Sequence, residues 1–388
     1  MPRSTADIAA RARETGRLGI DTEFMGEGRY QPLLCLAQIA LDDGDGGTEV
    51  IVLDPLTEEY DPAPLADVLA DPEIEIVLHA ARQDVALLRR DWGQPVRNVF
   101  DTQVAAGFAG MRAQLGYEPL LKETLGVRLR KSASFTRWDD RPLTDEQLGY
   151  AREDVLHLLQ VATALQDRLT ELGRLDWARE ECRSFESIDD RRDLEVVFGK
   201  LPRVNSLDPN QRAVARELVE WREEAARTGD RPVSSVLHDA ALVEIAKRRP
   251  QSVDRLRQIR GLNDATLHRR GKSIVEAVAR GREREPIPVE GVRPTQPDAE
   301  DAPLIALGEA LVRTRAMEAE LAYELIAARA DLQKIVTSVR EGSGEPDVRT
   351  LQGWRREVVG NELLELLAGR RALRVGPGAR LVIESDPE

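Results

Sequence analysis

Up to about residue 175, segments with short apolar runs alternate with segments in which hydrophobic residues recur at helical spacing. Short apolar runs rich in β-branched residues predict strands at about 18–24, 34–41, 49–53 and 74–79. Helical spacing predicts helices near 83–90, 102–108 and 119–125, and a long helix from 145 to about 172. Thr144 lies three residues before Gln147, the spacing of a capping box, which marks the start of the long helix. Strands that alternate with helices are typical of an α/β domain.

The hydrophobic pattern changes twice after this α/β segment. Residues 186–205 are polar and charged, with Gly199 and Pro202 as breakers, and they predict a connector. A helical pattern covers 206–285, a proline-rich linker follows at 286–303, and a second helical pattern covers 304–375. The sequence therefore predicts an α/β domain at 1–185, two small all-α domains, and a tail at 376–388.

The composition is that of a soluble globular protein with 388 residues, 41% of them hydrophobic and 32% charged. We find no apolar run near the roughly 18 residues that a membrane helix needs. The N-terminus lacks the apolar core of a secretory signal, and Cys35 and Cys182 form no spaced pattern. We therefore expect a cytoplasmic protein with no membrane partner.

The net charge of −14 argues against a general binder of polyanions. The charge is uneven, however, because residues 205–285 hold 17 arginines and lysines against 13 aspartates and glutamates. This helical segment can therefore contact nucleic acid although the chain as a whole is acidic.

Two carboxylates stand two positions apart on the first predicted strand, at Asp21 and Glu23, so they project from the same face. Two unpaired acids on a strand that otherwise reads as buried repel each other and resist desolvation. A divalent cation between them removes both costs, and oxygen ligands favour Mg²⁺ or Mn²⁺. The alternative is a strand end whose acids are simply solvated.

Two further elements carry acids to places where a common site would need them. Asp84 lies in the first helical turn after the strand at 74–79, which places it at the carboxyl edge of the sheet. In the long helix, Tyr150 and Asp154 are four residues apart and share one face. Taken alone, a tyrosine and an aspartate on one amphipathic helix are usually a packed ring and a solvated acid.

The order of these motifs resembles the DEDD superfamily of 3′-5′ exonucleases. It resembles the tyrosine branch, because Gly149 stands where the histidine branch carries its histidine. Further segments are similar to those typical of the ribonuclease D family, namely Gln38-Ile39, His79-Ala80, Phe100-Asp101-Thr102-Gln103 and Arg141-Pro142-Leu143-Thr144. The resemblance covers about residues 15 to 170, and it implies a ribonuclease H-like fold in which helices flank a mixed sheet.

The resemblance also implies a catalytic arrangement. Asp21, Glu23, Asp84 and Asp154 would hold two divalent ions, Mg²⁺ or Mn²⁺, about 3.5 to 4 Å apart, with Asp21 as the bridging ligand. Glu23 and Asp154 would bind the first ion, and Asp84 would reach the second through water. One ion would lower the pKa of a bound water, and Tyr150 would orient or deprotonate that water.

Other residues near these motifs are expected to contact the substrate or to support the fold. His79 and Gln83 can assist the site by hydrogen bonds, although a histidine at a strand end is more often structural. Asp101 is expected to cap the helix that follows it. The segment 131–138 can contact a nucleic-acid backbone and stack on a base, or it can be an ordinary loop. The candidate substrate contacts are Thr22, Phe24, His79, Gln83, Lys131, Phe135 and Arg137.

The helical segment 206–285 resembles the HRDC domain, with Pro232 and Gly261 at the expected breaks. Its net positive charge favours contact with a nucleic-acid backbone, and the alternative is a packing or dimerisation domain. Residues 304–375 resemble a second, diverged copy. Gly271-Lys272-Ser273 is not a phosphate loop, because Thr266 occupies the position of the first glycine and the segment reads as helical.

The sequence therefore predicts a metal-dependent 3′-5′ exoribonuclease of ribonuclease D type. Its expected partner is RNA, such as tRNA precursors or other structured RNA with 3′ ends to be trimmed, and its products are nucleoside monophosphates. A DNA 3′-5′ exonuclease on the same domain is the alternative enzyme. A non-catalytic RNA-binding scaffold is the alternative from another class. The sequence does not decide between a monomer and an oligomer.

Overall fold

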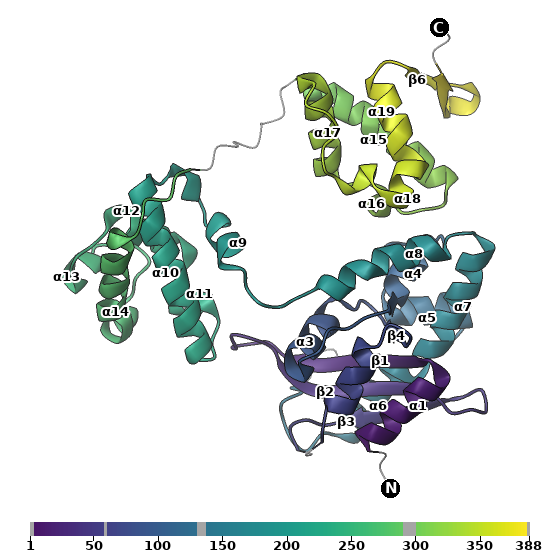
Figure 1. The fold of residues 1–388 in the computed structure, drawn as a ribbon, viewed down its shortest axis with the longest axis horizontal. Coiled ribbons are helices and arrows are strands. Elements are labelled where there is room, and N and C mark those ends of the chain that lie inside the picture. The colour runs from purple at the N-terminus through teal and green to yellow at the C-terminus, as the bar shows by residue number, and fades with distance from the viewer. Residues whose placement is uncertain (1–3, 58–59, 130–136, 290–299, 386–388) are drawn as a thin grey trace.

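The computed structural model describes residues 4–57, 60–129, 137–289 and 300–385. The chain forms an α/β domain and two helical domains (Figure 1). The second helical domain lies against the helices of the α/β domain, and the first stands to one side. No helix in these four ranges is long and apolar enough to cross a membrane.

A five-stranded mixed sheet forms the centre of the α/β domain, in the order β3-β2-β1-β4-β5. The strand β1 pairs antiparallel with β2 and parallel with β4, and β2–β3 is an antiparallel hairpin. The strands are β1 (Arg17–Met25), β2 (Leu33–Asp42), β3 (Thr48–Leu53), β4 (Glu75–Leu78) and β5 (Val99–Asp101). Four of them were predicted from the sequence, whereas the three residues of β5 are too few to show a period.

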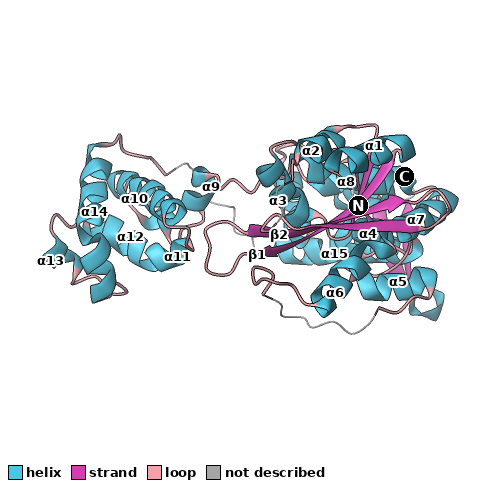
Figure 2. Cartoon of the chain, turned by 90° about the horizontal axis from the view of Figure 1, so that it is seen from below, coloured by secondary structure: helices cyan, strands magenta, loops and turns pink. Residues whose placement is uncertain are grey.

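Helices cover both faces of this sheet (Figure 2). On one face, α1 (Thr5–Thr15), α2 (Ala63–Ala70) and α3 (Arg82–Trp92) pack over side chains such as Ile20 and Ile39. The other face carries α4 (Thr102–Phe108), α5 (Tyr117–Leu125), α6 (Asp145–Leu156) and α7 (Leu158–Glu171), and α8 (Leu175–Cys182) follows. The predicted mixed sheet with flanking helices is therefore confirmed.

The single long helix predicted over 145–172 is wrong, because the structure divides it into α6 and α7. The capping box at its start is present, since the Thr144 hydroxyl accepts from the Gln147 backbone and the Gln147 side chain accepts from the Thr144 backbone. The helix breaks at His157, whose φ of −107° and ψ of 6° are not helical. The apolar period continues through this residue, so the sequence shows no break. In space, α6 packs on β1, β2 and β3, whereas α7 turns toward β1, β2 and β4.

The first helical domain has its own apolar core. Its helices are α9 (Leu194–Gly199), α10 (Pro209–Thr228), α11 (Val233–Val236), α12 (Asp239–Arg248), α13 (Val253–Leu256) and α14 (Asp264–Glu283). The helix α9 lies inside the segment that was expected to be a connector, and its Phe198 is buried in this core. Gly271-Lys272-Ser273 is part of α14, as the sequence predicts.

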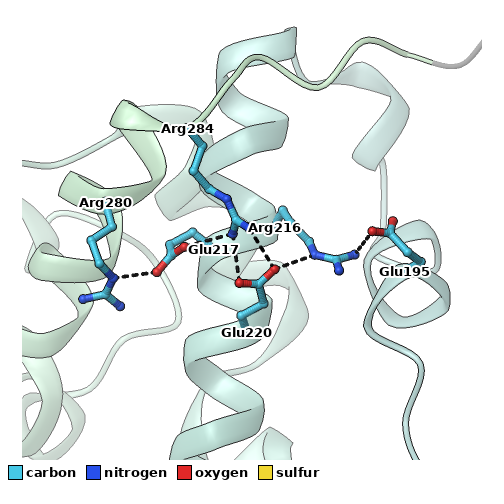
Figure 3. Close-up of polar contacts among 6 residues, drawn as sticks. All are labelled: Glu195, Arg216, Glu217, Glu220, Arg280 and Arg284. Atoms are coloured by element: carbon cyan, nitrogen blue, oxygen red, sulfur yellow. Dashed lines mark hydrogen bonds and ion pairs between the residues drawn. The ribbon is translucent and has the colours of Figure 1, made fainter.

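A chain of ion pairs fastens three segments of this domain to one another (Figure 3). Arg216 on α10 pairs with Glu195 on α9 and with Glu220 one turn further along α10. Arg284, directly after α14, pairs with Glu220 and with Glu217 on α10. Because Arg216, Glu220 and Arg284 each pair with two partners, the network joins α9 and the end of α14 to the same face of α10.

The second helical domain packs against the α/β domain through aromatic side chains. Trp354 stacks on Trp177 at 5.4 Å between ring centres and meets the edge of Phe108 at 4.9 Å. The domain contains α15 (Asp301–Glu318), α16 (Tyr323–Ile326), α17 (Arg329–Glu341), α18 (Gly353–Arg355), α19 (Asn361–Leu367) and the hairpin β6 (Arg371–Val375) and β7 (Leu381–Ser385). Thus α15 begins within the segment predicted as a linker, and β7 lies in the predicted tail.

Candidate active site

The strand β1 is longer than its parallel neighbour β4, so the last part of β1 is unpaired on that side and other side chains can approach it. Its pairing with β4 ends at Gly19, which lies opposite Val77, whereas β1 continues to Met25. Asp21 and Glu23 are in the extended part, on one face of the strand. On the other side of β1 the sheet continues, and β2 places Gln38 opposite Asp21.

The helix α6 packs over this part of the sheet and brings a third acid to it. One carboxylate oxygen from each of Asp21, Glu23 and Asp154 lies within 4.8 Å of the others. The three residues are all partly buried. Side chains that are more than 130 positions apart in the sequence therefore form one acidic cluster.

The cluster is electrostatically costly without a cation. Burial, followed by repulsion from Asp154 and Asp84, raises the pKa of Glu23 to about 8. Burial raises the pKa of Asp154 to about 7. Burial and the charges of the other acids also raise the pKa of Asp21 well above its usual value. A set made entirely of carboxylate oxygens, and destabilised by its own charge, fits a hard divalent cation such as Mg²⁺ or Mn²⁺.

Asp84 lies beside this cluster, in the first turn of α3. Its Oδ1 accepts a hydrogen bond from the Thr22 hydroxyl at 2.5 Å, and its side chain is buried. Burial raises the pKa of Asp84 to about 6, and its charge contributes to the raised pKa of Asp21. Thr22, a candidate substrate contact, is thus buried and engaged with Asp84.

Asp101 holds the turn that positions Asp84. Its Oδ2 accepts from the Ala81 backbone at 2.6 Å, and its Oδ1 accepts from the backbone of Gln103 and Val104. The predicted cap of α4 is confirmed. The bond to Ala81 supports the β4–α3 turn, where Ala80 adopts a φ of 58°, unusual for a residue other than glycine. The sequence does not predict this second role, because the hydrogen bond joins two elements that are 20 residues apart in the chain.

Tyr150 contributes a hydroxyl to the acidic cluster. The hydroxyl hydrogen-bonds the Asp154 carboxylate one turn further along α6, and the ring lies 6.0 Å from the buried ring of Trp138. Burial, and the charges of Asp154, Glu23 and Asp21, raise the pKa of Tyr150. The phenol therefore stays protonated near neutral pH in the metal-free protein and acts as a hydrogen-bond donor.

The segment that carries Trp138 is anchored to the sheet by Arg141, one of the residues in the family-like motifs. Its guanidinium pairs with Asp54 at 2.6 Å and donates to the carbonyl oxygens of Trp138 at 2.6 Å and Cys35 at 3.0 Å. Arg141 therefore holds Trp138 in place beside the ring of Tyr150. The sequence did not predict that role.

The other candidate substrate contacts lie in different settings. His79 bonds the Thr102 hydroxyl through Nδ1 at 2.9 Å, and burial lowers its pKa to about 4. Gln83 is exposed, Phe24 is partly buried beside a bulge in β1, and Arg137 pairs with Asp139 at 2.9 Å. Two candidates lie outside the described residues, namely Lys131 and Phe135.

Tyr117 is a neighbour of the site that the sequence analysis missed. Its ring lies 5.4 Å from that of His79 at the start of α5. Burial, and then the charges of Asp154 and Asp21, raise its pKa, which places the hydroxyl within the field of the cluster. Because the sequence around it reads as an ordinary amphipathic helix, no motif marked this residue.

Without metal, the melting temperature is expected to fall as the pH rises from about 5.5 to 8.5. The pKa values in the folded protein are about 6 for Asp84, about 7 for Asp154 and about 8 for Glu23, against about 4 in an unfolded chain. The folded state therefore keeps protons that the unfolded chain has released. That stabilisation is lost as the pH rises through the folded-state values. Thermal unfolding in EDTA at several pH values measures the trend.

Asp154→Asn is the matched variant for this measurement. It removes one charge from the cluster, so its melting temperature should depend less on pH than that of the wild type. Addition of Mn²⁺ at the upper end of the range should raise the wild-type melting temperature, because the cation takes the place of the lost protons. Equal pH dependence in the two proteins would contradict the prediction.

The chain is similar to known proteins over most of its length. Residues 3–170 match the family model described as 3′-5′ exonuclease, and residues 211–278 match that of the HRDC domain. A ribonuclease D from Gluconacetobacter diazotrophicus is 36% identical, with 95% of this chain and 92% of that protein covered. One from Nitrobacter hamburgensis is 34% identical, covering 98% and 97%. The crystal structure of Escherichia coli RNase D, an exoribonuclease involved in structured RNA processing, is 27% identical with a TM-score of 0.78, covering 94% and 96%.

Proposed function

This chain belongs to the ribonuclease D family of 3′-5′ exoribonucleases, and we propose that its acidic cluster hydrolyses RNA from the 3′ end. The observation that carries the assignment to these residues is the convergence of Asp21, Glu23 and Asp154 within 4.8 Å, with Asp84 beside them. We assign the nuclease to residues 1–185, and HRDC-type domains to 206–285 and 304–375.

The DEDD exonucleases typically depend on divalent metal ions, and the carboxylates of this site suit that chemistry. We assign Asp21, Glu23, Asp84 and Asp154 as the residues that hold two ions, Mg²⁺ or Mn²⁺. When bound, such ions supply positive charge that stabilises the attacking and leaving oxygens of the scissile phosphate. The raised pKa values of Glu23 and Asp154 support this assignment, because a site that repels its own charge gains most from a cation.

The side chains around the ions have separable roles. Asp154 accepts from Tyr150, so the helix α6 presents a ligand and a donor from the same turn. We assign Tyr150 to orienting the attacking water through its hydroxyl, which is protonated and held by that bond. Thr22 holds the Asp84 carboxylate by its hydroxyl, and we assign it to keeping that acid in place for the second ion.

The substrates we propose are tRNA precursors and other structured RNA with single-stranded 3′ ends. Support comes from the crystallised relative that acts in structured RNA processing and from the match of residues 211–278 to the HRDC domain. The arginine-rich helices of this domain provide charge that can contact the RNA backbone while its 3′ end is in the nuclease domain.

The proposed function is tested with an RNA hairpin that carries a 5′ label and an unpaired 3′ extension. Addition of Mg²⁺ or Mn²⁺ should shorten the RNA stepwise from its 3′ end and release nucleoside monophosphates, and EDTA should stop the reaction. A DNA oligonucleotide of the same sequence should be cleaved much more slowly. Equal or faster cleavage of DNA would favour a DNA exonuclease, and binding of RNA without cleavage would favour a scaffold.

A further inference from the structure

Gln38, in the middle of β2, is buried in an unusual way. Its side chain has no exposed surface, and neither its amide nitrogen nor its amide oxygen has a hydrogen-bond partner among the described residues. Its neighbours along the strand, Ala37 and Ile39, are apolar and fully buried. The strand therefore carries one polar side chain through an apolar region of the sheet.

Packing does not explain this glutamine. A buried amide without partners pays the cost of desolvation and regains nothing from hydrogen bonds. An unbranched apolar side chain of similar length, such as methionine, would fill the same space without that cost. The residue therefore destabilises the fold at this position, which is expected where a side chain serves the site and not the core.

The position of Gln38 indicates which residue of the acidic cluster it assists. The β1–β2 register places it directly opposite Asp21. Residues opposite each other in an antiparallel pair project to the same face, with Cβ atoms about 4.5 to 5.5 Å apart. A glutamine amide easily spans that distance to a neighbouring carboxylate. The other residues that β2 places opposite the extended part of β1 on this face offer no such group, since Glu23 lies opposite Leu36.

We infer that Gln38 is a positioning residue for Asp21, whose amide N–H donates to the Asp21 carboxylate when that carboxylate is ionised and holds a cation. The inference rests on the proposed function of the acidic cluster. Carboxylates that bind metal ions are themselves hydrogen-bonded by surrounding groups, which fix their orientation. Thr22 already provides such a bond to Asp84, and Gln38 lies where it can provide one to Asp21.

The test is Gln38→Met, which keeps the length of the side chain and removes both polar atoms. We expect the metal-free melting temperature to stay the same or rise, because two unpaired polar atoms leave the core. We expect the affinity for Mn²⁺, measured by calorimetry on the full chain, to fall by about 10-fold or more. The kcat for RNA should fall, with KM little changed. Ile39→Leu is the matched control, because Ile39 lies on the same strand but faces away, opposite Ile20.

The outcomes separate this inference from the proposed function. If wild-type protein binds Mn²⁺ and Gln38→Met binds it within twofold, Gln38 is only a structural residue and the inference is overturned. If the wild type binds no Mn²⁺, or Asp21→Asn binds it equally well, the metal site itself is overturned and the inference with it. If Gln38→Met does not fold, Gln38→Asn provides the same comparison, because it retains the amide but withdraws it from Asp21 by one methylene group.

Discussion

Replacement of Asp21 or Asp154 by asparagine is expected to lower the rate of RNA hydrolysis by about 10³-fold or more, because ions at such sites contribute several kcal/mol to the transition state. Each substitution removes a negative charge that binds the metal ions but keeps the shape of the side chain. The folded state should be preserved, because Asp21 and Asp154 repel each other in the metal-free protein. Single-turnover rates on 5′-labelled RNA in Mn²⁺, with melting temperatures alongside, measure both effects.

The control for these variants is Asp167→Asn, which changes an exposed carboxylate on α7 away from the cluster. Its rate should equal that of the wild type. Full activity in Asp21→Asn or Asp154→Asn would remove the two-metal assignment. Loss of activity together with loss of the folded state would leave the role of the charge unproven, and the circular dichroism spectrum of each variant therefore belongs to the experiment.

Tyr150→Phe is expected to lower kcat by about 10²-fold or more, the range that a positioned proton donor or acceptor contributes, with little change in the affinity for RNA. The substitution removes the hydroxyl that bonds Asp154, while the ring keeps its place 6.0 Å from that of Trp138. Binding is measured by fluorescence anisotropy in Ca²⁺ or EDTA, and turnover in Mn²⁺. The two measurements separate the hydroxyl from the ring.

Tyr323→Phe serves as the matched control, since this tyrosine lies on α16 in the second helical domain, where it packs against Arg313. Its turnover should be unchanged. If Tyr150→Phe instead lost affinity for RNA and kept its kcat, the ring would be a stacking or structural residue and the hydroxyl would have no part in the reaction.

Local features of the site were predictable because they depend on the period of single elements. Alternation along β1 determines that Asp21 and Glu23 share a face, and helical spacing determines that Tyr150 and Asp154 do. The N-cap at Asp101 was predictable in the same way, since it bonds residues two and three positions away. None of these features needs knowledge of a distant part of the chain.

Features that depend on packing between elements were missed or mistaken. No glycine or proline marks the break at His157 in the sequence. The helix breaks there because α6 and α7 pack on different strands. Similarly, α9 lies in a charged segment, and its Phe198 finds a core only when α10 is alongside. Tyr117, the anchoring role of Arg141, and the bond from Ala81 to Asp101 were missed for the same reason.

The amino-acid sequence by itself determined which side chains share a face of each strand and helix, because the peptide backbone repeats every two residues in a strand and every 3.6 in a helix. It also carried the motifs by which the family is recognised. Only the tertiary structure decided that Asp21, Glu23 and Asp154 approach within 4.8 Å, and that Gln38 lies opposite Asp21 with no hydrogen-bond partner in the part of the chain that the structure describes. Distances between elements follow from how their side chains pack, and packing depends on many contacts at once that no local period encodes.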